Sequence, residues 1–141
     1  FAALPLLVSF IPMLMDTGGN CGSQSATLII RGIALGEIRF SDLFRVMFKE
    51  FRVSLIVGVV LALANGLRIL IMYRNAGLAL VIGLSLVATV IISKLIGCLL
   101  PLFAKKLHMD PAIMASPLIT TLVDTCSILI YFNIATRIFQ L

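Results

Sequence analysis

The chain carries little charge for its length. Only 12% of its 141 residues are charged, whereas 61% are hydrophobic. A soluble domain averages about 25% charged and about 45–50% apolar residues, so this chain lacks the polar surface that a globule in water requires. The composition argues against a soluble enzyme, a nucleic-acid-binding module and a disordered tail. We predict a membrane protein, or the membrane part of one, that is not an enzyme.

Cysteine and histidine are also scarce. Cys21, Cys98 and Cys126 fall in apolar stretches without a CxxC spacing, and His108 is the single histidine. Structural zinc sites need four Cys or His ligands, with characteristic short spacings between them. We therefore expect free, buried thiols and no zinc site.

One tripeptide, Asp16-Thr17-Gly18, matches the D-T-G sequence of aspartic proteases. That chemistry requires a second carboxylate close by, on a β-rich soluble fold that the composition disfavours. An intramembrane protease with Asp16 and Asp124 as its catalytic pair is the weakest alternative that the sequence leaves open.

Long apolar runs make up most of the chain, and about 20 such residues cross a membrane as a helix. We predict spans over about 1–38, 53–73, 78–104 and 111–136, and an amphipathic interfacial helix over about 41–51 that Ser41 caps. Helices are the only open-ended structure that satisfies every backbone polar group in lipid. The expected fold is an all-α polytopic membrane helix bundle with one interrupted span, forming a single ion-conducting domain over 1–141.

The basic residues are distributed unevenly between the two ends of the predicted spans. One side holds seven of them: Arg31, Arg39, Arg45, Lys49, Arg52, Lys105 and Lys106. The other side holds Arg68, Arg74 and Arg137. Because Lys and Arg accumulate in cytoplasmic loops, we expect 39–52 and 105–109 in the cytoplasm of a cell (inner) membrane protein. Residues 74–77 and the C-terminus would then be extracytoplasmic.

Asp124 is the polar residue that is most costly to place in lipid. It follows Asp110 by 14 residues, about 21 Å along a helix, and a carboxylate at that depth costs about 2.5–3.5 kcal/mol. Ser116 and Thr120 precede it at intervals of four residues, and Ser127 and Tyr131 continue the same face. Pro117 frees a carbonyl near Ile113. These oxygen donors suit Mg²⁺ or Ca²⁺; the alternative is an acid that hydrogen-bonds between helices for structural reasons.

A second polar stripe lies in the first span. Thr17, Asn20, Gln24, Thr27 and Arg31 recur at helical spacing. The sequence Gly18-Gly19-Asn20 weakens the helix there, and broken helices at membrane depth line cavities or pack in protein. We predict that this stretch lines a pore beside Asp124.

Two further features of the membrane segments leave their roles open. The glycine pairs Gly18/Gly22 and Gly32/Gly36 favour close helix packing. Lys94 is the remaining intramembrane charge, and it could snorkel to the interface, pair with an acid or face a cavity.

Two long motifs resemble the membrane domain of the MgtE family of Mg²⁺ channels. The first is Pro12, then Gly18-Gly19-Asn20-x-Gly22-x-Gln24-Ser25-x-Thr27 and Arg31-Gly32-x-Ala34-Leu35-Gly36-Glu37-Ile38. The second is Asp110-Pro111-Ala112, then Pro117-Leu118-x-Thr120-Thr121-x-x-Asp124 and Tyr131-Phe132. The motifs stand in the family's order, and the resemblance covers essentially the whole chain.

The resemblance implies a homodimer with a pore on its twofold axis. This chain would hold the second to the fifth membrane helix, downstream of cytosolic domains that sense Mg²⁺. Asp124 would bind the ion, Thr120 would face it through its backbone carbonyl, and Ser116 would form the cytoplasmic-side constriction. The pore-lining residues would further include Gly18, Gly19, Asn20, Gln24 and Thr121.

We therefore expect passive, potential-driven influx of Mg²⁺, with Mn²⁺, Co²⁺ or Ca²⁺ as surrogates. One Asp124 per chain gives two negative charges across a twofold axis, which independently favours a homodimer in lipid. The alternatives are a cation-coupled exchanger that uses Asp124 and a membrane scaffold subunit that transports nothing.

Overall fold

The computed structural model describes residues 3–114 and 116–140, with side chains for 5–113 and 117–140. The elements are helical throughout this part of the chain, which confirms the all-α prediction. They are α1 (Ala3–Ser9), α2 (Ile11–Ala34), the 3₁₀ turn η1 (Phe40–Asp42), α3 (Leu43–Tyr73), α4 (Ala76–Lys106), the 3₁₀ turn η2 (Pro111–Met114) and α5 (Ser116–Phe139).

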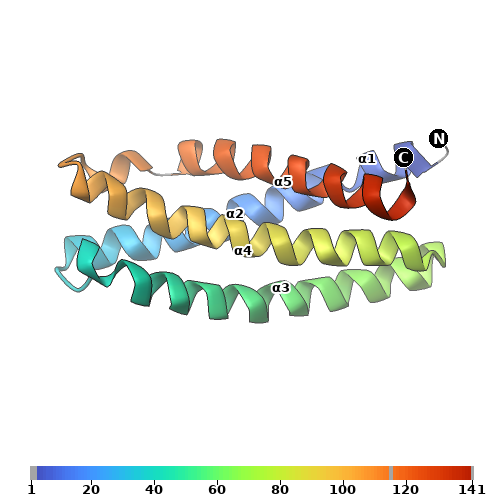
Figure 1. The fold of residues 1–141 in the computed structure, drawn as a ribbon, viewed down its shortest axis with the longest axis horizontal. Helices are drawn as coiled ribbons and strands as arrows, with labels where there is room; N and C mark the ends of the chain where they lie inside the picture. Colours follow the sequence, from blue (N-terminus) through green and yellow to red (C-terminus); the bar gives the residue numbers. More distant parts are fainter. Residues whose placement is uncertain (1–2, 115, 141) are drawn as a thin grey trace.

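The four long helices form an elongated bundle in which α4 is central (Figure 1). Helix α4 packs against α2, α3 and α5, and α2 also packs against α5. The α2–α3 and α4–α5 connections lie at one end of the bundle, whereas the α3–α4 turn, the start of α1 and the end of α5 lie at the other. All seven basic residues that we assigned to one side are therefore at the same end.

Three helical segments of the described chain are long and apolar enough to cross a membrane: 40–73, 76–106 and 117–139. The chain is thus a multi-pass membrane bundle. Helix α2 is not among the three, because polar residues such as Asp16 and Asn20 occupy its middle. Its 24 residues extend about 36 Å, so a fourth span remains a prediction from length.

Helix α3 is longer than the span that the sequence predicts. The expected amphipathic segment and the span form one continuous helix over Leu43–Tyr73. Ser41 does not cap it, because η1 begins first and the Asp42 carboxylate accepts the Arg39 backbone N–H at 3.0 Å. The amphipathic face is nevertheless present: Met47 packs towards α2 and α4, whereas Phe44 is exposed.

The helix interruption lies at Phe10 and not at Gly18-Gly19. Helix α1 ends at Ser9 and α2 begins at Ile11, with Pro12 in its first turn, where a missing N–H costs nothing. Helix α2 then continues through both glycines, because packing against neighbouring helices outweighs their weak helix propensity.

The first glycine pair brings α2 close to α4 and α5. A Cβ atom on Gly18 would lie 2.8 Å from the Cγ2 atom of Thr89, and one on Gly22 would lie 2.9 Å from the Cγ2 atom of Ile119. The packing interpretation of this pair is therefore confirmed. The second pair differs, because Gly36 adopts a positive φ of 74° just after the end of α2, and a Cβ atom built there would meet no described atom within 4 Å.

Gly97→Ala should destabilise the bundle. A Cβ atom on Gly97 would overlap the backbone carbonyl of Gly22, so α2 and α4 would have to separate, which typically costs about 1–3 kcal/mol. We expect a lower thermal unfolding midpoint in detergent. The control is Gly66→Ala, whose new methyl group would meet only the Ala79 carbonyl at 3.9 Å. Equal midpoints for the two variants would contradict the predicted overlap.

Candidate ion-binding groove between α2 and α5

A polar groove of about 360 Å³ lies between α2 and α5. We call it the α2–α5 groove. It is lined by Met15, Asp16, Gly19, Asn20 and Ser23 from α2, and by Thr120 and Asp124 from α5.

Helical periodicity accounts for this lining. On α2, residues at intervals of four form two adjacent rows: one is Asp16 and Asn20, and the other is Met15, Gly19 and Ser23. On α5, Thr120 stands one turn before Asp124. Gly19 allows the helices to approach, because its Cβ atom would lie 3.3 Å from the Cγ2 atom of Thr120. The double glycine thus has two roles, since Gly18 packs in the bundle interior while Gly19 lines the groove.

Among the described residues that line the groove, two carry carboxylates and none is basic. Asp124 is half-buried and has no hydrogen bond or ion pair with any residue that the structure describes. Asp16 is exposed and accepts a hydrogen bond from the Asn20 side-chain amide at 3.4 Å. A half-buried acid without a basic partner favours a cation as its counter-charge.

The groove contains two further kinds of oxygen that could serve as ligands. They are the Asn20 side-chain amide and the Ser23 and Thr120 hydroxyls. The Pro117 carbonyl accepts the Thr120 hydroxyl at 3.1 Å and the Thr121 hydroxyl at 2.9 Å. Pro117 stands in the first turn of α5, so our expectation that it frees the Ile113 carbonyl inside a helix is wrong.

The structure brings together only part of the predicted site. Asp124, Thr120, Gly19 and Asn20 share the groove, whereas Gly18, Gln24 and Thr121 are absent from its lining. Gln24 and Thr121 are exposed elsewhere on their helices. The side chain of Ser116 lies outside the described residues.

The polar stripe on α5 divides at Asp124. Beyond it, Ser127 is buried in the bundle beside Gly18, at 3.1 Å from the position of its missing Cβ atom. The Tyr131 hydroxyl donates to the Leu7 carbonyl at 2.6 Å and thereby ties α5 to α1. These two residues therefore have a structural role.

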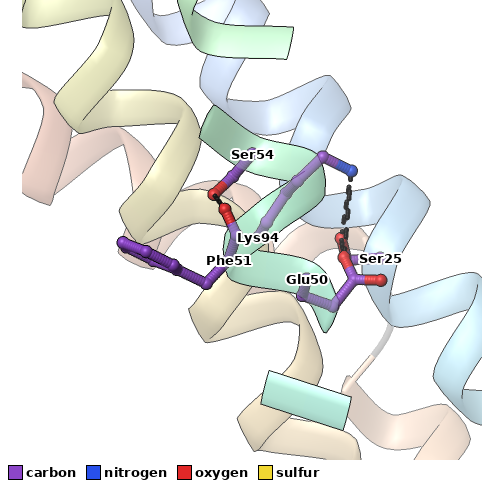
Figure 2. Close-up of polar contacts among 5 residues, drawn as sticks. All are labelled: Ser25, Glu50, Phe51, Ser54 and Lys94. Carbon is purple, nitrogen blue, oxygen red and sulfur yellow. Dashed lines mark hydrogen bonds and ion pairs between the residues drawn. The ribbon is translucent and has the colours of Figure 1, made fainter. Parts of the chain in front are cut away.

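A second polar cluster lies inside the bundle, where Lys94 of α4 meets Glu50 of α3 and Ser25 of α2 (Figure 2). The Ser25 hydroxyl donates to Glu50 Oε2 at 2.7 Å, and Lys94 Nζ lies 3.9 Å from the same oxygen. Lys94 Nζ also donates to the Ser25 hydroxyl at 3.4 Å. Lys94 and Glu50 are only 3% and 7% exposed. Among the three alternatives for Lys94, pairing with an acid is therefore confirmed.

Our sequence reasoning missed two of these acids. Asp16 belongs to the stretch that we predict to line the pore, but it is not among the predicted site residues, although it stands one turn before Asn20. Glu50 falls within the predicted amphipathic segment over about 41–51, where charged residues are expected to face water. However, Glu50, Ser54 and Gly58 recur at intervals of four residues, and all three are buried. That row of polar and small residues on an apolar helix was the available signal.

No group of three or more His, Cys, Asp or Glu side chains that could hold a metal is present in the described part of the chain. Cys21, Cys98 and Cys126 are free thiols. An ion in the groove would thus meet at most two carboxylates of this chain. That number suits Mg²⁺, which usually binds one or two carboxylates and keeps several waters.

Comparisons with known proteins agree with this chemistry. The chain is 42% identical over 130 residues to the magnesium transporter MgtE of Bacillus subtilis, which covers 92% of this chain. It is 38% identical over 140 residues to the MgtE of Thermus thermophilus, and 35% identical over 131 residues to that of Enterococcus faecalis, which cover 98% and 93% of this chain.

The chain spans only about 30% of the length of these relatives, namely 29%, 30% and 29%. A family model described as a divalent cation transporter matches residues 11–134. That match covers most of the chain and includes all of α2 and most of α5, the two helices that line the groove. We conclude that this chain belongs to the MgtE family.

Proposed function

We propose that this chain is the ion-conducting membrane domain of a Mg²⁺ transporter, and that Asp124 in the α2–α5 groove binds the ion. The observation that carries the proposal is the half-buried Asp124 carboxylate without a basic partner among the described residues. The names of the relatives, all magnesium transporters, support Mg²⁺ as the substrate.

The size of the groove suits a hydrated ion. Mg²⁺ is octahedral and dehydrates reluctantly, and six waters fill about 180 Å³ at about 30 Å³ each. The groove, at about 360 Å³, has room for an ion with its water shell. The Asn20, Ser23 and Thr120 oxygens would then bind coordinated waters, while Asp124 supplies charge. Asp16 would add a second charge that draws cations into the groove.

The open groove favours a homodimer. It forms one wall only, and two copies facing each other across a twofold axis would enclose a pore with at least two carboxylates. Such closed twofold symmetry is the commonest arrangement of homo-oligomers. The upstream cytosolic Mg²⁺-sensing domains would act on this pore, and lipid would cover the apolar outer face of α3.

The charge distribution supports an orientation. The seven basic residues at the α2–α3 and α4–α5 connections would face the cytoplasm. A divalent ion that moves inward through the pore then gains about 4.6 kcal/mol per 100 mV of membrane potential. The membrane potential is therefore sufficient to drive passive influx of Mg²⁺ without a coupled ion.

Flux measurements in proteoliposomes test the proposal. The full-length protein is reconstituted, a potassium diffusion potential is imposed, and Mg²⁺ uptake is followed with an internal dye. Uptake that depends on the potential and needs no counter-ion would support a channel. Uptake that requires a proton or Na⁺ gradient would favour an exchanger, and no uptake would favour a scaffold; either result would overturn the proposal.

Two adjacent glycines provide a test of the pore wall. Gly19→Leu should reduce Mg²⁺ flux at least tenfold, because its side chain would fill the groove beside Thr120, while the protein stays folded. Gly18→Leu should instead lower the thermal unfolding midpoint, because its Cβ atom would lie 2.8 Å from both Thr89 and Val123 side-chain carbons. Unchanged flux through a folded Gly19→Leu protein would remove α2 from the pore wall.

A further inference from the structure

A second cavity, of about 640 Å³, lies between the C-terminal turns of α2, the 35–38 turn and the first turns of α3. We call it the basic interfacial pocket. Its lining residues belong to the end of the bundle that holds the α2–α3 connection (Figure 1), and none of them lines the α2–α5 groove. Its lining includes four basic residues: Arg31, Arg45, Lys49 and Arg52.

Most of this positive charge is not neutralised within the chain. Arg45 forms an ion pair with Asp42 at 3.2 Å, and the acid Glu50 is engaged by Ser25 and Lys94. Arg31 and Lys49 have no hydrogen bond or ion pair with any described residue. The Arg52 guanidinium stacks over the Phe48 ring at 4.9 Å, which leaves its N–H donors available.

The lining of the pocket contains two acids, Glu37 and Glu50. Because Glu50 is paired with Lys94, Glu37 is the acid in the described lining that opposes these three cations. The pocket therefore presents net positive charge and N–H donors to an incoming group. Arginine and lysine side chains of this kind are the usual partners of phosphate.

The lining of the pocket also contains exposed apolar side chains, which a binding site for a free anion would not require. Leu28, Leu35 and Phe48 line it and are 53%, 59% and 60% exposed. Phe44, one turn before Phe48, is exposed on the same helix. Cations beside exposed apolar side chains at the end of a membrane bundle match a phospholipid, whose phosphate lies at the interface and whose acyl chains lie below it.

We propose that the basic interfacial pocket binds an anionic phospholipid. Arg31, Lys49 and Arg52 hold its phosphate group, and Leu28, Leu35 and Phe48 contact its acyl chains. A bound lipid would link the end of α2, which continues into the groove wall, to the start of α3. The proposal does not depend on which ion the groove conducts.

To test binding, the full-length protein in detergent is titrated with phosphatidylglycerol, phosphatidylcholine or inorganic phosphate. Native mass spectrometry detects the bound ligand, and the thermal unfolding midpoint reports the stabilisation that binding produces. The test variant is Arg31→Gln, Lys49→Gln, Arg52→Gln. The control, Arg39→Gln, Lys105→Gln, Lys106→Gln, removes equal charge from the same end of the bundle. We expect phosphatidylglycerol to bind the test variant at least about tenfold more weakly than the wild type, and the control to bind within about twofold of the wild type.

Three outcomes would overturn the proposal. The first is an equal loss of phosphatidylglycerol affinity in the test and control variants, which would indicate diffuse electrostatic attraction. The second is binding of phosphatidylcholine as tight as that of phosphatidylglycerol. The third is stabilisation by inorganic phosphate equal to that by phosphatidylglycerol, which would indicate a site for free anions. If the triple variant does not fold, Lys49→Glu alone replaces it, because Lys49 is exposed, and it should weaken phosphatidylglycerol binding at least about threefold. Wild-type affinity in folded Lys49→Glu protein would equally refute the assignment.

Discussion

Asp124→Asn should reduce Mg²⁺ uptake at least 100-fold. A unit charge about 4 Å from a divalent ion contributes about 8 kcal/mol at an effective dielectric constant of about 20, and asparagine keeps the shape of the side chain but loses that term. Because the ion keeps part of its water shell, water would compensate for part of the lost electrostatic energy. The decrease in flux should therefore be smaller than about 8 kcal/mol would imply. The measurement is potential-driven uptake in proteoliposomes.

The control for this variant is Asp42→Asn. It removes an acid of the same type from the start of α3, where Asp42 pairs with Arg45 at the surface, and should leave the flux within about twofold of the wild type. Both variants should keep the wild-type elution volume and unfolding midpoint. Asp124 has no described protein partner to lose, and the ion pair of Asp42 with Arg45 lies at the surface, where such pairs contribute little to stability. Wild-type uptake by folded Asp124→Asn protein would rule out Asp124 as the ion ligand.

Lys94→Met should destabilise the bundle more than Gly97→Ala does. It would leave the Glu50 carboxylate buried, with the Ser25 hydroxyl as its one remaining donor among the residues that the structure describes. Removing one partner of a buried pair typically costs about 3–5 kcal/mol. We expect a clearly lower thermal unfolding midpoint in detergent, together with reduced yield from membranes.

The double variant Glu50→Gln, Lys94→Met serves as the control. It removes both charges, so no uncompensated charge stays buried, and replacing a whole buried pair is often neutral in free energy of unfolding. It should therefore be more stable than Lys94→Met alone. If the double variant is as unstable as the sum of its single substitutions, the two side chains do not interact energetically and the ion pair contributes nothing.

Much of the architecture followed from local features of the sequence. The apolar runs that predict spans over 53–73 and 78–104 correspond to α3, which ends at Tyr73, and α4, which runs from Ala76 to Lys106. Asn75 explains the boundary between them, because its side chain accepts the Leu78 backbone N–H at 3.1 Å and caps α4. Boundaries of this kind depend on neighbouring residues alone, so the sequence is enough to locate them.

The polar residues inside the bundle were less accessible to such reasoning. Periodicity places Thr120 and Asp124 on one face of α5, but it does not say that Ser127 and Tyr131 turn into the interior while Asp124 stays at the groove. That division depends on where α1 and α2 cross α5. The continuity of α2 through Gly18-Gly19 is likewise a consequence of packing against Thr89 and Val123, which outweighs local helix propensity.

By itself, the sequence determined that the chain is an all-α membrane bundle and that its basic residues gather at one end, and it predicted that Asp124 lies at a depth where an acid needs a counter-charge. Those properties follow from composition, run length and the free energy of transfer into lipid. Only the tertiary structure decided which charges meet. Lys94 lies 44 residues from Glu50 and 69 from Ser25, and Asp16 lies 108 residues from Asp124, so their encounters depend on how the helices pack and not on any local pattern.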